Sequence, residues 1–547
     1  MTGQFLVRAA EAEGGRLDGH RGVMKAVKTA VVLALHPDSR RAGDPALVRT
    51  ASSGAGELEA LQTADGLFAG GDNLASPPDS AFTINDAALT VRLLRHSPWP
   101  DDLGERLTRV LRTAAPALRT GGVHTPNHRW ELAAALAQCG VLLAESGLLE
   151  RAREWLCEGI DIDEDGLYSE RSPNYAAHVS NPSLTILADL VDRPELHELV
   201  HRNLHAQLDL TYRDGMVETV HSRRQDQHDP FPLGPFLGQF TRAAIRHSCT
   251  RCADGARRAA AAPGVPAVDV LTEQLLDPAL AAPLPAGTGP GPARRLFREA
   301  RLLHETRQNA EFTVYGGSDV PAAGRIASGL ACNPTFLRMR VGAVAVESLR
   351  LSREFFGLGP FRAEEMSVAG DRIVLSETVS AAYYQPLPAA ARRDDAVYGL
   401  EHEGRFAARM SFSQRSPDPV TLTTSIEVHL HDDGADLAIT TDGPAAAHAL
   451  EIAFPPGGEL TGAIPLGEGR FELAQGTATY ARHGDALRVG PGQGSGADRP
   501  PVYRPGEAYT VTGGTDALGG TRLYLTWRSP GTVHVNIAAS STAAWSR

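Results

Sequence analysis

Three clusters of polar residues in the first half of the sequence have the side-chain types needed for proton transfer and carboxylate binding. The first cluster places Asn127, His128 and Arg129 in succession, just before a predicted helix. All three side chains can donate hydrogen bonds to a carboxylate. Asn127 could instead cap the helix that follows, with Pro126 fixing the approach of the chain.

The second cluster occupies residues 165–178 and begins with an Asp-Gly turn. It contains Tyr168, Arg171, Tyr175 and His178, and the Ser-Pro pair before Tyr175 predicts a loop that leads into a helix. Tyrosine and histidine can transfer protons, and arginine can bind an anion. In a loop, the same side chains could also be solvated and have no function.

The third cluster, residues 214–228, is dense in charge and could be a solvated face. Alternatively it is a basic site in which Arg223, Arg224 and Gln225 bind a sugar carboxylate. His221 adds a candidate proton carrier.

The elements that must position these clusters are helices. Apolar residues recur at helical spacing over residues 22–35, 103–118, 131–149 and 184–210, separated by short polar or Gly-rich stretches. This pattern predicts a succession of helical hairpins, without strands, to about Arg258. In a closed ring of hairpins the three clusters would meet at one mouth.

The composition changes after the helices, where dense Pro and Gly predict a linker. Beyond it the apolar residues alternate with period two, as in Glu311–Tyr315 and Arg522–Trp527, which predicts many short strands. The expected fold is α+β multidomain. We expect a toroid over residues 1–260, a linker over 261–293 and an antiparallel β-sandwich over 294–547.

The order of these motifs resembles heparinase II/III-like and related alginate lyases. The resemblance rests on Asn-His-Arg followed by Asp-Gly-x-x-x-Glu-x-Ser-Pro-x-Tyr, whose last residue, Tyr175, lies 47 positions after His128. It implies an incomplete (α/α) toroid followed by a β-sandwich, and a carbon–oxygen lyase that cleaves a 4-O-linked uronate by β-elimination. The expected partner is therefore a uronate-containing carbohydrate.

The resemblance also implies residue roles. Asn127 and His128 would neutralise the uronate carboxylate, and Tyr175 would move protons. The family places a further histidine in the site from the β-domain, but residues 325–335 contain none, although Asn333 there is a candidate substrate-binding residue. We therefore expect His178 or His221 to act as the second proton carrier, and this route needs no metal or cofactor.

Composition excludes some classes of partner. The net charge of −12 argues against general nucleic-acid binding, and no apolar run is long enough to span a membrane. The first residues lack the features of a signal peptide, which predicts a cytoplasmic protein, or a secreted mature form without its leader. Cys249 and Cys252 form a CxxC without a second ligand pair at zinc-like spacing, so we interpret them as ordinary thiols.

Two alternatives to a lyase remain. A glycoside hydrolase on the same toroid would need two carboxylates at the scissile bond, and Asp165, Glu170, Glu218 and Asp226 are available without forming an evident pair. A non-catalytic carbohydrate-binding protein would need aromatic platforms, yet aromatic residues are 6% of the chain.

Overall fold

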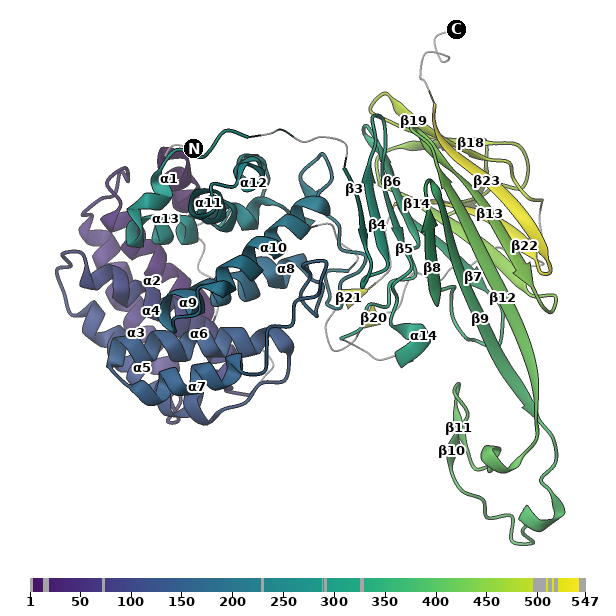
Figure 1. The fold of residues 1–547 in the computed structure, drawn as a ribbon, viewed down its shortest axis with the longest axis horizontal. Helices are drawn as coiled ribbons and strands as arrows, with labels where there is room; N and C mark the ends of the chain where they lie inside the picture. Colours follow the sequence, from purple (N-terminus) through teal and green to yellow (C-terminus); the bar gives the residue numbers. More distant parts are fainter. Residues whose placement is uncertain are drawn as a thin grey trace. The chain divides into compact units, whose positions relative to one another are not determined.

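The computed structural model divides into two compact units (Figure 1). The first unit comprises Met1–Thr219 and Pro230–Gly291, and the second comprises Val220–Asp229 and Pro292–Arg547. A short segment between two parts of the helical unit therefore belongs to the second unit. The structure describes residues 3–12, 19–70, 74–227, 231–287, 289, 293–324, 329–494, 508–509, 514–515 and 520–540.

The first unit is built almost entirely of helices. They are α1 (Gly3–Ala12), α2 (Gly19–Leu35), α3 (Pro45–Leu61), α4 (Pro77–Arg95), α5 (Leu103–Thr120), α6 (Pro126–Leu143), α7 (Ser146–Leu156), α8 (Pro173–Tyr175), α9 (Asn181–Leu190), α10 (Glu195–Asp209), α11 (Leu237–Arg246), α12 (Thr250–Ala261) and α13 (Ala267–Leu276). The short turns η1 (Ala176–Ser180), η2 (Gly234–Phe236) and η3 (Pro278–Ala281) and the strand pair β1 (Met216–Val217) and β2 (Phe231–Pro232) complete it. The strand pair departs from the predicted strand-free unit.

Several helices start in the same way, with a proline in the first turn after a polar residue. The side chains of Asp44, Ser76 and Ser172 each accept a hydrogen bond from a backbone N–H of the helix that follows. Proline fits there because its missing N–H has no partner in a first turn. These starts fix where α3, α4 and α8 begin.

Successive helices pair as hairpins, α2 with α3, α4 with α5, α6 with α7, α9 with α10 and α11 with α12. The first members of these pairs also touch one another, α2 with α4, α4 with α6 and α6 with α9. Helix α13 contacts α2, α4 and α11, and so brings the end of the unit back to its beginning. Lys28 of α2 joins three of these helices, because it bonds Asp86 of α4 and Asp269 of α13.

Three predicted boundaries in the first unit were wrong. The helix predicted over 131–149 is two helices, because Ala144 adopts the left-handed conformation with φ of 58° and ends α6. The helix predicted over 184–210 is also two, broken at Asp192 and the proline at 194. The predicted linker over 261–293 contains helix α13, whose short apolar face was hidden between Pro- and Gly-rich stretches.

The second unit consists mainly of two large sheets. The nine-stranded sheet has the order β16-β17-β22-β14-β7-β6-β5-β4-β3, and the eight-stranded sheet has the order β15-β18-β19-β23-β13-β12-β9-β8. The first contains β3 (Ala293–Phe297), β4 (Leu302–Thr306), β5 (Glu311–Tyr315), β6 (Leu337–Val341), β7 (Val344–Arg353), β14 (Ala447–Phe454), β16 (Ile464–Gly467), β17 (Arg470–Glu472) and β22 (Thr521–Arg528). The second contains β8 (Glu365–Ala369), β9 (Arg372–Tyr384), β12 (Pro417–Leu430), β13 (Gly434–Asp442), β15 (Glu459–Thr461), β18 (Ala478–Arg482), β19 (Asp485–Gly490) and β23 (Gly531–Ser540).

Both sheets bury their apolar residues in one common core. Phe312 and Ile452 enter it from the nine-stranded sheet, and Ile426 and Val535 enter it from the eight-stranded sheet. Neighbouring strands in these sheets pair antiparallel, except β17 and β22, which pair parallel. The period-two segments Glu311–Tyr315 and Arg522–Trp527 both lie in strands, as their alternation predicted.

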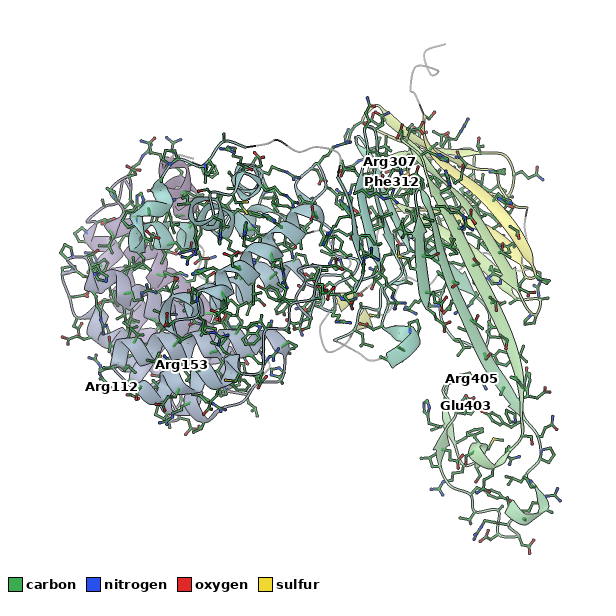
Figure 2. All side chains as sticks on the ribbon, in the orientation of Figure 1. Arg112, Arg153, Arg307, Phe312, Glu403 and Arg405 are labelled. Atoms are coloured by element: carbon green, nitrogen blue, oxygen red, sulfur yellow. The ribbon has the colours of Figure 1, made fainter. Side chains whose placement is uncertain are left out.

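The second unit has smaller elements beyond these sheets. They are α14 (Val320–Ala323), η4 (Ala389–Ala391), η5 (Phe412–Gln414) and the strand pairs β10 (Glu401–His402) with β11 (Ala407–Ala408) and β20 (Ala508–Tyr509) with β21 (Gly514–Thr515). The guanidinium carbon of Arg307 lies over the ring of Phe312, 6.0 Å from its centre, and both residues are labelled in Figure 2. In the parts of the chain described, no helix is long and apolar enough to cross a membrane.

Candidate active site

Asn127 and His128 lie in the first turn of α6, which begins at Pro126, so the prediction that they precede the helix was wrong. The N-cap residue is Thr125, so the alternative that Asn127 caps the helix is wrong. Instead the Thr125 hydroxyl donates to Asn127 Oδ1 at 2.8 Å, and this bond fixes which way the amide points. Asn127 is buried, and its Nδ2 has no hydrogen-bond partner among the described residues. A buried donor without a partner costs about 1–3 kcal/mol, which makes this amide a candidate for binding an anion.

The ring of His128 packs between two other rings. Its centre lies 5.0 Å from that of His124 and 6.1 Å from that of Phe82, which it meets edge to face. Phe82, in α4, is covered on its face by the guanidinium of Arg21 at 3.9 Å. His128 is therefore held against a wall that also carries a cation.

Arg129 points into a different set of contacts. Its guanidinium forms ion pairs with Glu158 at 2.9 Å and Asp161 at 3.3 Å, and lies over the ring of Trp130. These contacts hold the start of α6 to the loop after α7. The predicted substrate-binding role of Arg129 therefore competes with a network inside the protein.

Tyr175 and His178 follow one another through an unusual turn. The Ser172 hydroxyl oxygen accepts from the backbone N–H of Tyr175 at 3.1 Å and so starts α8, after which residues 176–180 form the π-helical turn η1. Such turns are frequent at functional sites. Arg171, just before them, adopts φ of 53°, a conformation that costs free energy in a non-glycine residue. Local strain thus surrounds the predicted catalytic residues.

Tyr168 is placed where it supports the structure. It is buried, and its hydroxyl donates to Asn181 Oδ1 at 2.7 Å. Asn181 Nδ2 donates in turn to Asn203 and Gln239, at 3.0 and 2.9 Å. Burial raises the pKa of Tyr168 far above its usual value, so the phenol stays protonated. It joins the loop to α9, α10 and α11.

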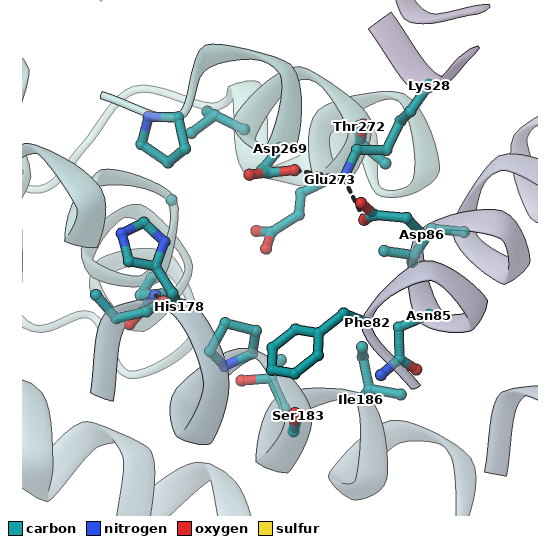
Figure 3. Close-up of a pocket in the computed structure, with 18 of the residues that line it drawn as sticks. Lys28, Phe82, Asn85, Asp86, His178, Ser183, Ile186, Asp269, Thr272 and Glu273 are labelled. Carbon is teal, nitrogen blue, oxygen red and sulfur yellow. Dashed lines mark hydrogen bonds and ion pairs between the residues drawn. The ribbon is translucent and has the colours of Figure 1, made fainter. Parts of the chain in front are cut away.

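A cavity of about 850 Å³ lies inside the helical unit (Figure 3). It is lined from helices α2, α4, α6, α9, α11 and α13 and by His178. Its volume is in the range of small-ligand pockets. Phe82, which touches His128, also lines this cavity, whereas Asn127, His128 and Tyr175 do not.

The His178 ring faces the cavity, with an edge-to-face contact to Phe231 at 6.1 Å. Although the ring is open to the cavity, protein surrounds it on most sides. This burial lowers its pKa, and the charge of Asp269 opposes the shift in part. A neutral imidazole at neutral pH can accept a proton.

Two buried charge systems in the cavity wall were not predicted from the sequence. Burial opposes the charge on Lys28, but Asp269 and Asp86 outweigh it and raise the pKa of this amine. Glu131 of α6 accepts hydrogen bonds from Asn85 Nδ2 at 2.8 Å and the Ser183 hydroxyl at 2.9 Å. Burial raises the pKa of Glu131 to about 7, although these bonds oppose the shift.

We expect Glu131→Gln to remove a pH dependence of stability. The unfolded chain loses this proton near 4.5, and the folded protein holds it to about 7. The wild type should therefore lose up to about 3 kcal/mol of unfolding free energy as pH rises from 4.5 through 7. Urea unfolding followed by helical circular dichroism at pH 5, 6, 7 and 8 measures this loss.

The variant should gain stability relative to the wild type as the pH rises. Glu150→Gln, an exposed carboxyl on α7, is the matched control and should keep the wild-type slope. Equal slopes for the wild type and Glu131→Gln would contradict the raised pKa.

The third cluster is divided between the units: residues 214–219 belong to the first unit, and the part from Val220 onward belongs to the second. Arg223 forms a two-pronged ion pair with Asp319, at 2.8 and 2.9 Å. Asn333 is buried, and its Nδ2 donates to the backbone carbonyl of Gln227 at 2.8 Å. Both predicted binding residues thus fasten the segment Val220–Asp229, which we name the strap, to the second unit.

The other members of this cluster lie in the strap itself. His221 is buried, and Arg224 and Gln225 are half-buried. The backbone N–H of Arg224 donates to the Ser222 hydroxyl oxygen, and that hydroxyl donates to Asp226. The first two clusters lie in the helical unit, whereas His221, Arg223, Arg224 and Gln225 of the third belong to the second unit. That all three clusters form one site therefore stays a prediction.

Comparison with solved structures bears on the fold. A heparinase III gene product aligns with 96% of this chain and 78% of its own, with a TM-score of 0.50 and 11% identity. The chain has a polysaccharide lyase fold. A heparan sulfate lyase from Pedobacter heparinus aligns over 95% of this chain and 76% of its own, with a TM-score of 0.47 and 11% identity. A Streptomyces coelicolor chondroitin AC lyase aligns over 99% of this chain and 79% of its own, with a TM-score of 0.46 and 15% identity.

No protein-family model and no curated protein sequence matches the chain. The polysaccharide lyase fold is therefore evident from the structural comparison alone. At such identity, residue roles must come from the chain's own geometry.

The charged residues that line the cavity were not predicted from the sequence. Lys28, Asp86 and Asp269 lie in three helices that are remote in sequence. Lys28 did leave a signal, because it interrupts the apolar stretch of α2. Asp269 left none, since it fell in a segment predicted to be a linker.

Proposed function

We propose that the protein is a polysaccharide lyase that cleaves a 4-O-linked uronate by β-elimination. The observation that carries the proposal is the position of the candidate residues. His178 lines a large cavity and His128 packs on its wall, in a chain with a polysaccharide lyase fold. We further propose that the helical hairpins form an incomplete toroid and that the two sheets form a β-sandwich.

In this proposal, the start of α6 binds the uronate carboxylate. Removal of the C5 proton places negative charge on that carboxylate, which becomes enolate-like. Donors that are already oriented stabilise this charge without reorganising. The Asn127 amide, held by Thr125, supplies one such donor, and His128 supplies another.

Two protons move in the reaction. A base takes the C5 proton, the electron pair of that bond forms the C4–C5 double bond, and the C4–O4 bond breaks. The departing O4 then takes a proton from an acid. We assign these steps to Tyr175 and His178, which lie three residues apart around η1. His221 stays the alternative second carrier.

The substrate class is an acidic polysaccharide. Heparinase III is the name of a structural neighbour, and this makes heparin-class glycans the first to test. The cations Arg21, Lys25 and Arg242 line the cavity, although Arg21 pairs with Asp79 at 2.9 Å and Arg242 pairs with Glu273 at 3.4 Å.

The test is the ultraviolet absorbance of the unsaturated uronate product, measured over a panel of uronate-containing polysaccharides and oligosaccharides. A rise in absorbance that matches the new reducing ends supports the lyase and identifies its substrate. Reducing ends without this absorbance would contradict elimination and favour hydrolysis. Neither signal on the whole panel would count against catalysis on uronates.

One observation favours hydrolysis as a second candidate. The cavity wall carries Asp86, Glu131, Asp269 and Glu273, and a hydrolase needs a pair of carboxyl groups at the scissile bond. Asp165, Glu170, Glu218 and Asp226, the acidic residues first considered, do not line it. If hydrolysis is observed, Glu131 is the first acid to test, because its pKa is raised to about 7.

A further inference from the structure

Helices α10 and α12 bring together two histidines and two cysteines. His201 and His205 lie one turn apart on α10, while Cys249 is the N-cap of α12 and Cys252 lies in its first turn. One ligand atom from each residue lies within 4.8 Å of each of the others. His205 Nε2 is 3.3 Å from Cys249 Sγ.

The distances are close to those around a bound zinc ion. With Zn–N near 2.0–2.1 Å and Zn–S near 2.3 Å, tetrahedral ligand atoms lie about 3.3–3.8 Å apart. No ligand–ligand distance in the cluster therefore needs to contract by more than about 1.5 Å. The spacings, Cys-x2-Cys and His-x3-His, are those of structural zinc sites.

The surroundings of Cys252 and His201 also favour a bound metal ion. Cys252 is buried, and His201 Nε2 is a buried ring nitrogen that has no hydrogen-bond partner in the described part of the chain. The other nitrogen of His201, Nδ1, lies 4.0 Å from the Glu198 carboxylate. A carboxylate behind a histidine orients it in many metal sites.

The two helices are held close without any ion. A Cβ added at Gly255 of α12 would lie 3.0 Å from Leu208 of α10, so this glycine permits their close approach. Arg251 pairs with Asp209, and Arg258 donates to the carbonyl of Tyr212 at 2.8 Å. The ligands thus lie on a rigid frame, which lowers the entropy cost of binding.

We propose that His201, His205, Cys249 and Cys252 bind one structural Zn²⁺ that links α10 to α12. On binding, each thiol releases its proton to solvent as its sulfur bonds the metal. Two thiolates and two neutral imidazoles balance the charge of Zn²⁺, as a partly buried site requires. None of the four residues lines the cavity, and the zinc proposal is independent of the proposed function.

The first measurement is the zinc content of tag-free, full-length protein purified without chelator. We expect about one zinc per chain by plasma mass spectrometry. Metal-free protein titrated with Co²⁺ should show visible d–d bands and a thiolate-to-cobalt charge-transfer band. The helical unit should melt at a lower temperature after chelation and recover when Zn²⁺ returns.

Variants identify the ligands. Cys249→Ser and Cys252→Ser should lose the charge-transfer intensity and most of the zinc. Cys157→Ser, an exposed thiol of the same unit, should keep both. If a ligand variant fails to fold, the wild-type zinc content and cobalt spectrum still decide.

The proposal is overturned if the wild type carries no zinc and its cobalt complex lacks thiolate bands. It is also overturned if Cys249→Ser binds cobalt like the wild type. A Cys249–Cys252 disulfide in the protein as purified, with no metal uptake after reduction, would likewise overturn it.

Discussion

Tyr175→Phe is expected to lower kcat on the best uronate substrate by at least about 100-fold, because it removes a group that transfers a proton in the transition state. The change deletes one hydroxyl and leaves the backbone bond from Tyr175 N–H to Ser172 intact. Stability should therefore change little, and KM should change less than kcat. Initial rates of double-bond formation measure the effect.

Tyr398→Phe is the matched control. This tyrosine lies between β9 and β12 of the second unit, and its hydroxyl oxygen accepts from the backbone N–H of Arg393. It should keep the wild-type rate. A Tyr175→Phe enzyme with near wild-type kcat would exclude Tyr175 from proton transfer and leave His178 or His221 as the carriers to test.

Lys28→Met is expected to destabilise the helical unit by about 3 kcal/mol, because removal of one partner leaves buried charge uncompensated. The Lys28 side chain is 5% exposed, and those of Asp86 and Asp269 are 32% and 55% exposed toward the cavity. Residual solvation of the two carboxylates places the effect at the lower end of the range for buried pairs. Urea unfolding followed by helical circular dichroism reports it, since the long helices all lie in the first unit.

Two comparisons separate charge from packing. Lys25→Met changes an exposed lysine of the same helix and should cost much less. Adding Asp86→Asn and Asp269→Asn to Lys28→Met should recover part of the loss, because the uncompensated charges are then gone. If this triple variant is as unstable as Lys28→Met alone, packing rather than charge pairing explains the effect.

Periodicity predicted element type well and element boundaries poorly. The period-two segments lie in strands because each has one face in the shared core. Helix α6 ends at Ala144, which adopts the left-handed conformation. A glycine at such a position would have marked the helix end in the sequence, but an alanine does not. Helix α13 was not predicted because the prolines and glycines on either side of it suggested a linker. Its contacts with α2 and α4 join segments that are distant in the sequence, so no local pattern indicated them.

The candidate site was predicted only in part. Local motifs located Asn127, His128, Tyr175 and His178, since each belongs to the start of a helix or to a loop with its own sequence signature. His201 and His205 are a second ligand pair at zinc-like spacing, so the expectation that Cys249 and Cys252 have no such pair was wrong. The two pairs lie on separate helices, 44 positions apart in the sequence, and only the fold brings them together. Contacts between segments that are distant in the sequence, such as that of Lys28 with Asp269, can be identified only once the fold is known.

The strap has a consequence for how the protein is made and cut. Arg223 emerges from the ribosome long before its partner Asp319, which follows 96 residues later. Until then, the buried His221 and its neighbours lack the surroundings they have in the finished protein. A single cut near residue 291 would leave the strap attached to the helical fragment and absent from the sheet fragment. Neither half is then a complete folding unit, and both should be produced together in one chain.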